Sequence, residues 1–267
     1  MPPRQSFPSH PRVRDAAALG FTSSLGPFAA NGIMPGFHAM AEDYGVSFVA
    51  VQQSLTIYLF TYAFFSLVAG SFSDSYGRRP TFIGGMLLFA AASVGAAFSQ
   101  SLWALYGWRL LQGIGAAVGQ VVTQAIVRDN WSGPEAANVN GMIAFFFAAG
   151  PALAPVVGGQ IVMHFGWHAV FLFLMVYSLS IAFFIYFRIP ETLNAADRSA
   201  FNLSVICSNY AKGLTHGAFM TGVVAHGILF MGGILYSAGS ADFVIKVMGL
   251  DVDEFGWLSI PLIFASF

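Results

Sequence analysis

Charged side chains are scarce in this sequence. Asp, Glu, Lys and Arg make up 9% of its 267 residues, whereas an ordinary soluble domain contains about 25%. Apolar residues reach 57%, and 28 residues are Phe. A soluble protein of this length could not bury so much apolar surface. The composition therefore predicts a protein whose solvent is lipid.

Cysteine is almost absent, and the charges nearly balance. A single cysteine, Cys207, excludes an internal disulfide framework and a thiolate-rich metal site. The net charge of -1 argues against a nucleic-acid partner. The sequence also lacks a nucleotide-binding loop and a nucleophile triad. We therefore expect a protein that is not an enzyme and has no cofactor, no metal site and no nucleic-acid partner.

Long apolar runs fill most of the chain. A bilayer core requires about 20 apolar residues per helix, whereas the strands of membrane barrels alternate polar and apolar residues. These runs do not alternate, so we expect an all-α polytopic membrane protein. The predicted spans are 16–37, 48–70, 80–99, 102–127, 137–163, 167–189 and 215–238, and an eighth begins near Gly256 and is cut off at Phe267.

The basic residues predict the orientation and the domains. All but Arg109 and Lys246 of the 11 lie on one side of the predicted spans, and the positive-inside rule places that side and the N-terminus in the cytoplasm. The longest polar connection contains "IPETLNAADRSA". We predict a cytoplasmic tail at 1–15, a six-helix bundle at 16–189, a cytoplasmic linker at 190–214 and the start of a second bundle at 215–267.

The stretch "GSFSDSYGRRP", Gly70 to Pro80, interrupts two apolar runs with charge. Glycine permits a tight turn, Asp74 can cap a helix start, and Pro80 suits a first helical turn. One interpretation is a hairpin whose charges only fix the topology. The other is a functional charge switch. Asp74 could also pair with Arg128 at the end of the fourth span.

Polar residues share one face of the span 102–127. At about 100° per residue, Arg109, Gln112, Gln120 and Gln124 fall on the same side. An intramembrane Arg is costly and usually lines a cavity or pairs with another group. The face therefore predicts a polar cavity. A buried hydrogen-bond ladder between helices is the alternative.

The span 137–163 contains "GMIAFFFAAGPALAPVVGGQI", with two prolines and four glycines. Neighbouring helices can satisfy the backbone groups that proline leaves free in a membrane. Packing of small residues between helices is the simplest interpretation.

These motifs, in this order, resemble those of the major facilitator superfamily and its Bcr/CflA drug-resistance branch. Further segments of the resemblance are "RLLQGIGAA", "AIVRDNWSGPEAA", "GPALAPVVGG" and "GWHAVFLFL". The resemblance implies a cytoplasmic gate formed by Gly70, Asp74, Gly77, Arg78 and Arg79, with Arg128 as a further member. It also implies a substrate cavity at Asn31, Arg109, Gln112, Gln120 and Gln124, and an antiporter motif at Gly150, Pro155, Gly158 and Gly159.

The implied function is proton-coupled efflux of drugs or small metabolites across the bacterial inner membrane. Its implied partners are a small-molecule substrate, protons and the lipid bilayer. Two features depart from the branch. Asn31 occupies the place of its usual Asp in "GPFAANGIMPGF" and cannot carry a proton. The chain also stops inside the eighth span, as a truncated protein would. A truncated non-transporting fragment and a solute importer of the same superfamily are the alternatives.

Overall fold

The computed structural model describes residues 13–225, 227, 228 and 231. These residues belong to two units, which divide between Phe201 and Asn202. The division falls inside the predicted linker 190–214. The helices of the first unit are α1 (Val13–Asn31), α2 (Phe37–Tyr44), α3 (Phe48–Tyr76), α4 (Arg78–Ala97), α5 (Leu102–Asn130), α6 (Gly133–Phe165) and α7 (Trp167–Arg188), with short 3-10 turns at Met34–Gly36 and Ala195–Asp197.

Five helices are long and apolar enough to cross a membrane within the described part of the chain, namely α3, α4, α5, α6 and α7. The described residues contain helices and no strand. The prediction of an all-α, multi-pass membrane protein is therefore confirmed. Five of the predicted spans coincide with these helices to within a few residues. The predicted eighth span lies outside the described residues, and so do 10 of the 24 residues of the predicted span 215–238.

The first predicted span, 16–37, is too long. Helix α1 is continuous only to Asn31, and the chain then turns through Met34–Gly36 into α2. Pro35 lies at the start of that turn, where it has no N–H to donate to a longer helix. Local side-chain caps start two of the other helices. The Ser47 and Ser101 hydroxyls accept hydrogen bonds from the backbone N–H groups of Ala50 and Ala104.

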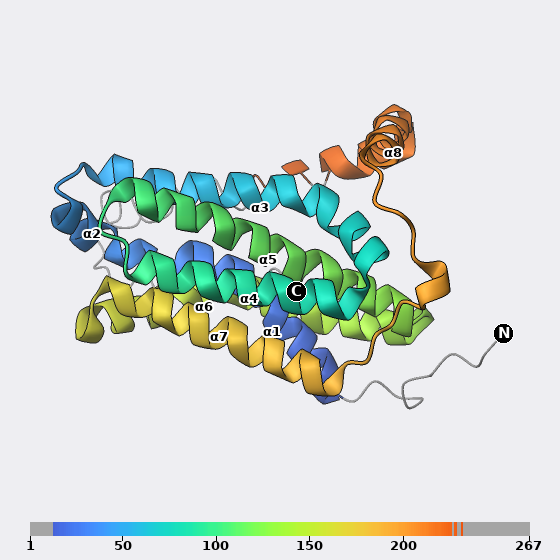
Figure 1. The fold of residues 1–267 in the computed structure, drawn as a ribbon, viewed down its shortest axis with the longest axis horizontal. Coiled ribbons are helices and arrows are strands. Elements are labelled where there is room, and N and C mark those ends of the chain that lie inside the picture. The colour runs from blue at the N-terminus through green and yellow to red at the C-terminus, as the bar shows by residue number, and fades with distance from the viewer. Residues whose placement is uncertain (1–12, 226, 229–230, 232–267) are drawn as a thin grey trace, which may run out of the picture. The chain divides into compact units, whose positions relative to one another are not determined.

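Helices α1 and α3–α7 lie side by side in the first unit (Figure 1). Helix α5 packs against α3 and α4, α1 packs against α6, and α4 also packs against α7. The core between them is continuous and includes Tyr58, Phe82, Phe89 and Phe171, each fully buried. This packing brings residues of α1, α3, α4 and α5 together around the middle of α5.

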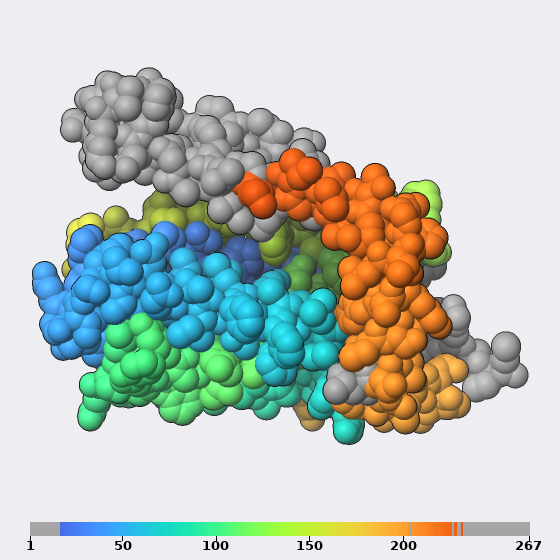
Figure 2. Space-filling model, turned by 90° about the horizontal axis from the view of Figure 1, so that it is seen from above, coloured from blue at the N-terminus to red at the C-terminus, as the bar shows by residue number. Residues whose placement is uncertain are grey.

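Large apolar side chains also lie on the outside of the first unit. Helix α3 forms the blue-to-cyan band on the surface in Figure 2, and its Phe60 is 72% exposed. Trp103 and Phe165 are 81% and 76% exposed. Such surfaces are unfavourable in water and are normal where a helix faces lipid. The second unit contains α8, Leu203–Thr215, which the sequence analysis placed within the linker.

Candidate functional site

The turn between α3 and α4 depends on Gly77. Its φ of +100° is a conformation that residues with a side chain rarely adopt. A Cβ atom at this position would lie 2.5 Å from the Glu191 Oε2 atom and 3.0 Å from the Arg198 Nη2 atom. Glycine is therefore required by the backbone and by the close approach of the segment that follows α7.

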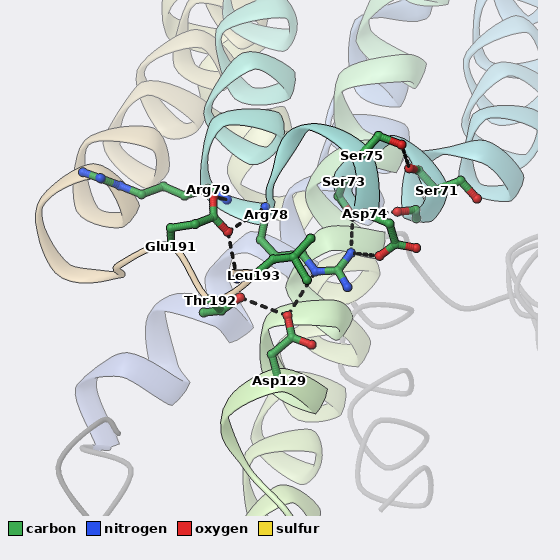
Figure 3. Close-up of polar contacts among 11 residues, drawn as sticks. Ser71, Ser73, Asp74, Ser75, Arg78, Arg79, Asp129, Glu191, Thr192 and Leu193 are labelled. Atoms are coloured by element: carbon green, nitrogen blue, oxygen red, sulfur yellow. Dashed lines mark hydrogen bonds and ion pairs between the residues drawn. The ribbon is translucent and has the colours of Figure 1, made fainter. Parts of the chain in front are cut away.

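Arg78 is the centre of the polar contacts at this turn (Figure 3). Its guanidinium forms an ion pair with Asp74 and donates to the Ser73 hydroxyl at 2.6 Å. Its Nε atom donates to the Asp129 Oδ2 atom at the end of α5, at 3.0 Å. Arg78 is only 7% exposed. A buried guanidinium with two carboxylates is well compensated, and these contacts join α3, α4 and α5.

Glu191 holds the first turn of α4 from the segment after α7. Its carboxylate accepts hydrogen bonds from the backbone N–H groups of Arg78 at 2.9 Å and Arg79 at 3.2 Å. The first N–H groups of a helix have no partner within the helix and lie at the positive end of its dipole. A carboxylate is therefore the favoured acceptor there.

Thr192 adds a second connection from the same segment. Its hydroxyl donates to the Asp129 Oδ2 atom at 2.9 Å, the oxygen that also accepts from Arg78. We call these residues the Arg78 network. At one end of the first unit, it links α3, α4, α5 and the segment that follows α7. Its members are Ser73, Asp74, Arg78, Asp129, Glu191 and Thr192.

The other predicted gate residues have different surroundings. The Arg79 guanidinium donates to the Tyr186 carbonyl oxygen and lies over its ring, 4.8 Å from the centroid. Gly70 lies beside α5, where a Cβ atom would meet Val121 at 3.6 Å. Arg128 is exposed and forms no ion pair with a described residue. The suggested pairing of Asp74 with Arg128 was wrong, because Asp74 pairs with Arg78, the first residue of α4.

The sequence analysis missed Asp129 and Glu191. Asp129 follows Arg128 directly, and Glu191 follows the proline that ends α7. Both are carboxylates beside basic residues at the predicted cytoplasmic end. That signal was present in the sequence. The bonding of Glu191 to backbone N–H groups 113 and 112 residues away depends on tertiary packing and has no local signature.

Arg109 and Gln112 lie in the interior of the first unit, and both are fully buried. The Arg109 guanidinium lies over the Tyr58 ring, 4.4 Å from its centroid, and donates to the Ala29 carbonyl oxygen at 3.2 Å. It also donates to the Gln112 Oε1 atom at 3.0 Å, and Gln112 donates to the Ser93 hydroxyl at 2.8 Å. This arrangement has the form of the hydrogen-bond ladder, which was the alternative interpretation.

Gln120 and Gln124 are separated from that ladder. Both are partly exposed, and the Gln120 Oε1 atom has no hydrogen-bond partner within the described part of the chain. Asn31, at the end of α1, is partly exposed and donates to the Pro27 carbonyl oxygen at 2.8 Å. The five predicted cavity residues therefore form at least two separate groups. Their role in binding a substrate stays a prediction.

The predicted antiporter motif lies where α6 crosses α1. A Cβ atom at Gly158 would be 1.9 Å from the Gly32 carbonyl oxygen, and one at Gly150 would be 3.0 Å from the Pro27 Cβ atom. Gly159 is less crowded, with its nearest neighbour at 3.9 Å. Pro155 lies inside α6 between these positions. The motif permits close packing of α6 on the part of α1 that carries Asn31.

The fold and the Arg78 network agree with the family resemblance. Comparison with known proteins shows to which family the chain belongs. A family model described as Major Facilitator Superfamily matches residues 19–267. The chain belongs to the major facilitator superfamily. Solved structures of other transporters share its fold at low identity. The human organic anion transporter MFSD10 (TETRAN) has a TM-score of 0.54 and 23% identity, and covers 74% of this chain and 53% of its own.

A peptide transporter, POT in complex with sulfate, has a TM-score of 0.62 and 17% identity. That match covers 95% of this chain and 50% of the other. At these identities, both structures support the fold alone.

Curated relatives include proteins named for drug resistance. A "Bicyclomycin resistance protein homolog" of Haemophilus influenzae is 31% identical over 93% of this chain and 64% of its own length. "Multidrug resistance protein D" of Escherichia coli is 32% identical over 63% of this chain and 43% of its own. These names agree with the resemblance to the Bcr/CflA branch. The chain spans less than two thirds of the length of either relative.

Proposed function

We propose that this member of the superfamily forms part of a secondary active transporter that exports drugs or small metabolites. The observation that carries the proposal is the Arg78 network. It binds the ends of α3, α4 and α5 to the segment after α7 through ion pairs and single hydrogen bonds. Such contacts can break and re-form without unfolding a helix. This is what a gate requires in a transporter whose two bundles alternate between states.

The direction of transport is proposed from two features. The chain is similar to proteins named for resistance to bicyclomycin and to multiple drugs. The close packing of Gly158 on Gly32 also matches the antiporter motif expected from the sequence. Because the chain spans 64% of the length of the bicyclomycin-resistance relative, the proposal concerns the activity of the whole transporter to which this chain corresponds.

Protons are the proposed coupling ion, and the bacterial inner membrane is the proposed location. We propose that the end with the Arg78 network faces the cytoplasm. Arg78, Arg79, Arg128 and Arg188 all lie at this end, as the positive-inside rule favours. The neutral Asn31 removes the usual carboxylate from α1, so another group must carry the coupling proton.

The proposal can be tested by measuring the accumulation of a fluorescent, drug-like cation in bacterial cells. The protein would be expressed from its natural gene in a host that lacks its own multidrug exporters. We expect lower dye accumulation in expressing cells, and a protonophore should abolish the difference. Higher accumulation would identify an importer. Unchanged accumulation of a panel of dyes, with the protein in the membrane, would favour the non-transporting alternative.

A further inference from the structure

Trp167, the first residue of α7, packs against helix α2 at the end of the first unit where α6 turns into α7 (Figure 1). Its side chain is buried, and its indole N–H donates to the Asp43 carboxylate at 2.5 Å. The centroid of the Tyr44 ring lies 5.6 Å from that of the indole, and a Cβ atom at Gly36 would lie 3.0 Å from the Trp167 Cβ atom. Trp167 therefore contacts both the last turn of α2 and the turn that precedes α2.

Helix α2 depends on such tertiary contacts for its stability. It has eight residues, and an isolated helix shorter than about 12 residues is marginal in water. Phe37 and Met40 are buried in the first unit, and the Tyr44 hydroxyl forms a hydrogen bond with the Ser99 hydroxyl at 2.6 Å. The hydrogen bond between Trp167 and α2 is therefore part of what holds this short helix in place.

The indole ring of Trp167 also has an imidazole on its face. The His168 ring is stacked on it, with the ring centroids 3.6 Å apart and the ring planes inclined by 23°. His168 is exposed, so protons from the surrounding water reach it. Imidazole gains or loses its charge between about pH 5 and 8, and a cation over an indole face is attracted electrostatically by the ring. The strength of this stacking therefore depends on pH.

Helix α7 packs against α1, α2, α4 and α6, and these helices carry other ionisable groups near Trp167. The ends of α1 and α4 at this side contain no charged residue. Burial raises the pKa of Tyr44 above its ordinary value of 10.0, and carboxylates ordinarily ionise near pH 4. Histidines are therefore the groups that titrate between about pH 5 and 8. The ionisable groups at this end, besides His168, are His38, Glu42, Asp43 and Tyr44 on α2 and His164 on α6.

The three histidines at this end have different neighbours. The His38 ring lies 4.6 Å from the Phe48 ring, and the His164 ring lies 6.3 Å from the Phe165 ring. Within the described part of the chain, His168 is the histidine whose ring is stacked on the indole. A change of charge at His168 therefore acts directly on the side chain that holds α2.

We propose that His168 makes the attachment of α2 to α7 dependent on pH, so that α2 is held more tightly when His168 is protonated. The imidazolium then lies on the face of the indole, while the Asp43 carboxylate accepts from the N–H of the same indole. A favourable interaction of the protonated form is present at low pH and is lost as the pH rises and the imidazole gives up its proton. This inference depends neither on transport activity nor on the orientation of the chain in the membrane.

The test follows Trp167 and α2 separately in the full chain, reconstituted in lipid nanodiscs so that both faces meet the same buffer. Fluorotryptophan is incorporated in place of the five tryptophans, and Trp167→Phe identifies the fluorine NMR signal of Trp167. We expect that signal to shift as the pH changes from about 5.5 to about 8. Hydrogen–deuterium exchange of a peptide that contains residues 37–45 reports on α2. Its protection, relative to the unfolded peptide at the same pH, should be about two- to five-fold greater at the lower pH.

Three variants assign the effect to one histidine. His168→Gln removes the charge at an exposed position and should abolish the pH dependence of both measurements. His164→Gln is the matched control, because it makes the same change at an exposed histidine four residues away, and it should behave as the natural protein does. His168→Arg keeps a positive charge that can stack on the indole. It should protect α2 at the higher pH about as well as the natural protein is protected at the lower pH.

Three results would overturn the proposal. The first is a Trp167 signal that does not move over this pH range in the natural protein. The second is an equal shift of that signal in His168→Gln, since another group would then cause it. The third is equal protection of α2 at both pH values in the natural protein, because the charge on His168 would then not affect the attachment of α2.

Discussion

The buried Arg109 is the residue whose surroundings differ most from the expected cavity. Its guanidinium has no carboxylate partner in the described residues, and it lies between the Tyr58 ring, the Ala29 carbonyl and Gln112. A cation over an aromatic face gains on the order of 2 kcal/mol when both are desolvated. The Nε and Nη2 atoms have no hydrogen-bond partner in the described part of the chain. Arg109 therefore stabilises the contact of α1, α3 and α5, while part of its hydrogen-bonding capacity is unused.

Cysteine labelling can separate the two groups of polar residues on α5. In a Cys207→Ser background, Gln120→Cys should react readily with a small water-soluble thiol reagent, because position 120 is partly exposed. Gln112→Cys should react much more slowly, because position 112 is fully buried. The rates would be measured by mass spectrometry on the folded protein. Equally rapid labelling at both positions would restore the single wet cavity that the sequence predicted.

Asn31→Asp is expected to introduce a dependence on pH. The Asn31 amide donates to the Pro27 carbonyl oxygen. A protonated Asp carboxyl can keep that hydrogen bond, whereas an ionised carboxylate cannot donate and would face the carbonyl oxygen. Dye efflux in the variant should therefore vary more steeply with pH than in the natural protein. Asn31→Gln, which keeps an amide, is the control. Identical pH profiles for all three proteins would exclude position 31 from coupling.

The sequence indicated which polar residues share a face of α5, but not which side chains surround each of them. The period of the helix correctly placed Arg109 and Gln112 on one face, because neighbouring turns of a helix have fixed geometry. It did not separate that pair from Gln120, since the separation depends on which helices cover each turn of α5. The sequence therefore identified the polar face of α5 that carries Arg109. It did not show that Arg109 itself is fully buried.

Among the helices, the close contact of α6 with α1 requires a residue without a side chain at position 158. Gly158→Ala would place a Cβ atom 1.9 Å from the Gly32 carbonyl oxygen, so α6 must shift. Overpacking of this kind costs about 1–3 kcal/mol, which outweighs the gain in helix propensity of up to about 1 kcal/mol. We expect a lower midpoint of thermal unfolding for the protein in detergent.

Gly159→Ala is the matched control for that variant. It makes the same change one residue away, where the nearest neighbour of a Cβ atom would be 3.9 Å distant. The control should leave the midpoint unchanged or raise it. An equal effect of the two substitutions would mean that α6 does not need to approach α1 this closely.

At the other end of the helices, Glu191→Ala should release the first turn of α4. The Arg78 and Arg79 amides would lose their acceptor. Loss of hydrogen bonds to a charged acceptor costs about 1.5–3 kcal/mol, or roughly a 10- to 150-fold faster exchange if the turn opens locally. Hydrogen–deuterium exchange of a peptide that contains residues 78 and 79 measures this directly.

Glu135→Ala serves as the control for that measurement. Glu135 is exposed in the first turn of α6, a comparable helix position. It should leave the exchange at residues 78 and 79 unchanged. Unchanged exchange in Glu191→Ala itself would remove Glu191 from the Arg78 network.

The long helices could be predicted because a membrane-spanning apolar run must satisfy its backbone hydrogen bonds internally. For a run of 20 or more apolar residues, an α-helix does this. The starts of α3 and α5 also follow from Ser47 and Ser101, which cap them. The short helices α2 and α8 were missed. Helix α2 lies almost entirely in the connection between the predicted spans 16–37 and 48–70, and α8 lies in the predicted linker 190–214. Each is shorter than a membrane span, so the search for long apolar runs could not detect it.

At the scale of the whole molecule, the first unit is tied together at both ends. At one end, the Arg78 network joins α3, α4, α5 and the segment after α7. At the other, the Trp167 indole N–H donates to the Asp43 carboxylate at 2.5 Å, and the Tyr44 hydroxyl donates to the Ser99 carbonyl at 3.2 Å. These contacts connect α2 with the α4–α5 and α6–α7 turns.

We propose that this chain belongs to an exporter whose movement depends on the Arg78 network. The most direct test is proton-driven dye transport into everted membrane vesicles that contain the natural gene product, its Asp74→Asn variant and a Glu135→Gln control. Asp74→Asn removes the charge that pairs with Arg78. We expect transport by the natural protein and the control, and a clear loss in Asp74→Asn at equal membrane abundance. Full transport by Asp74→Asn, or none by the natural protein across a panel of dyes, would contradict it.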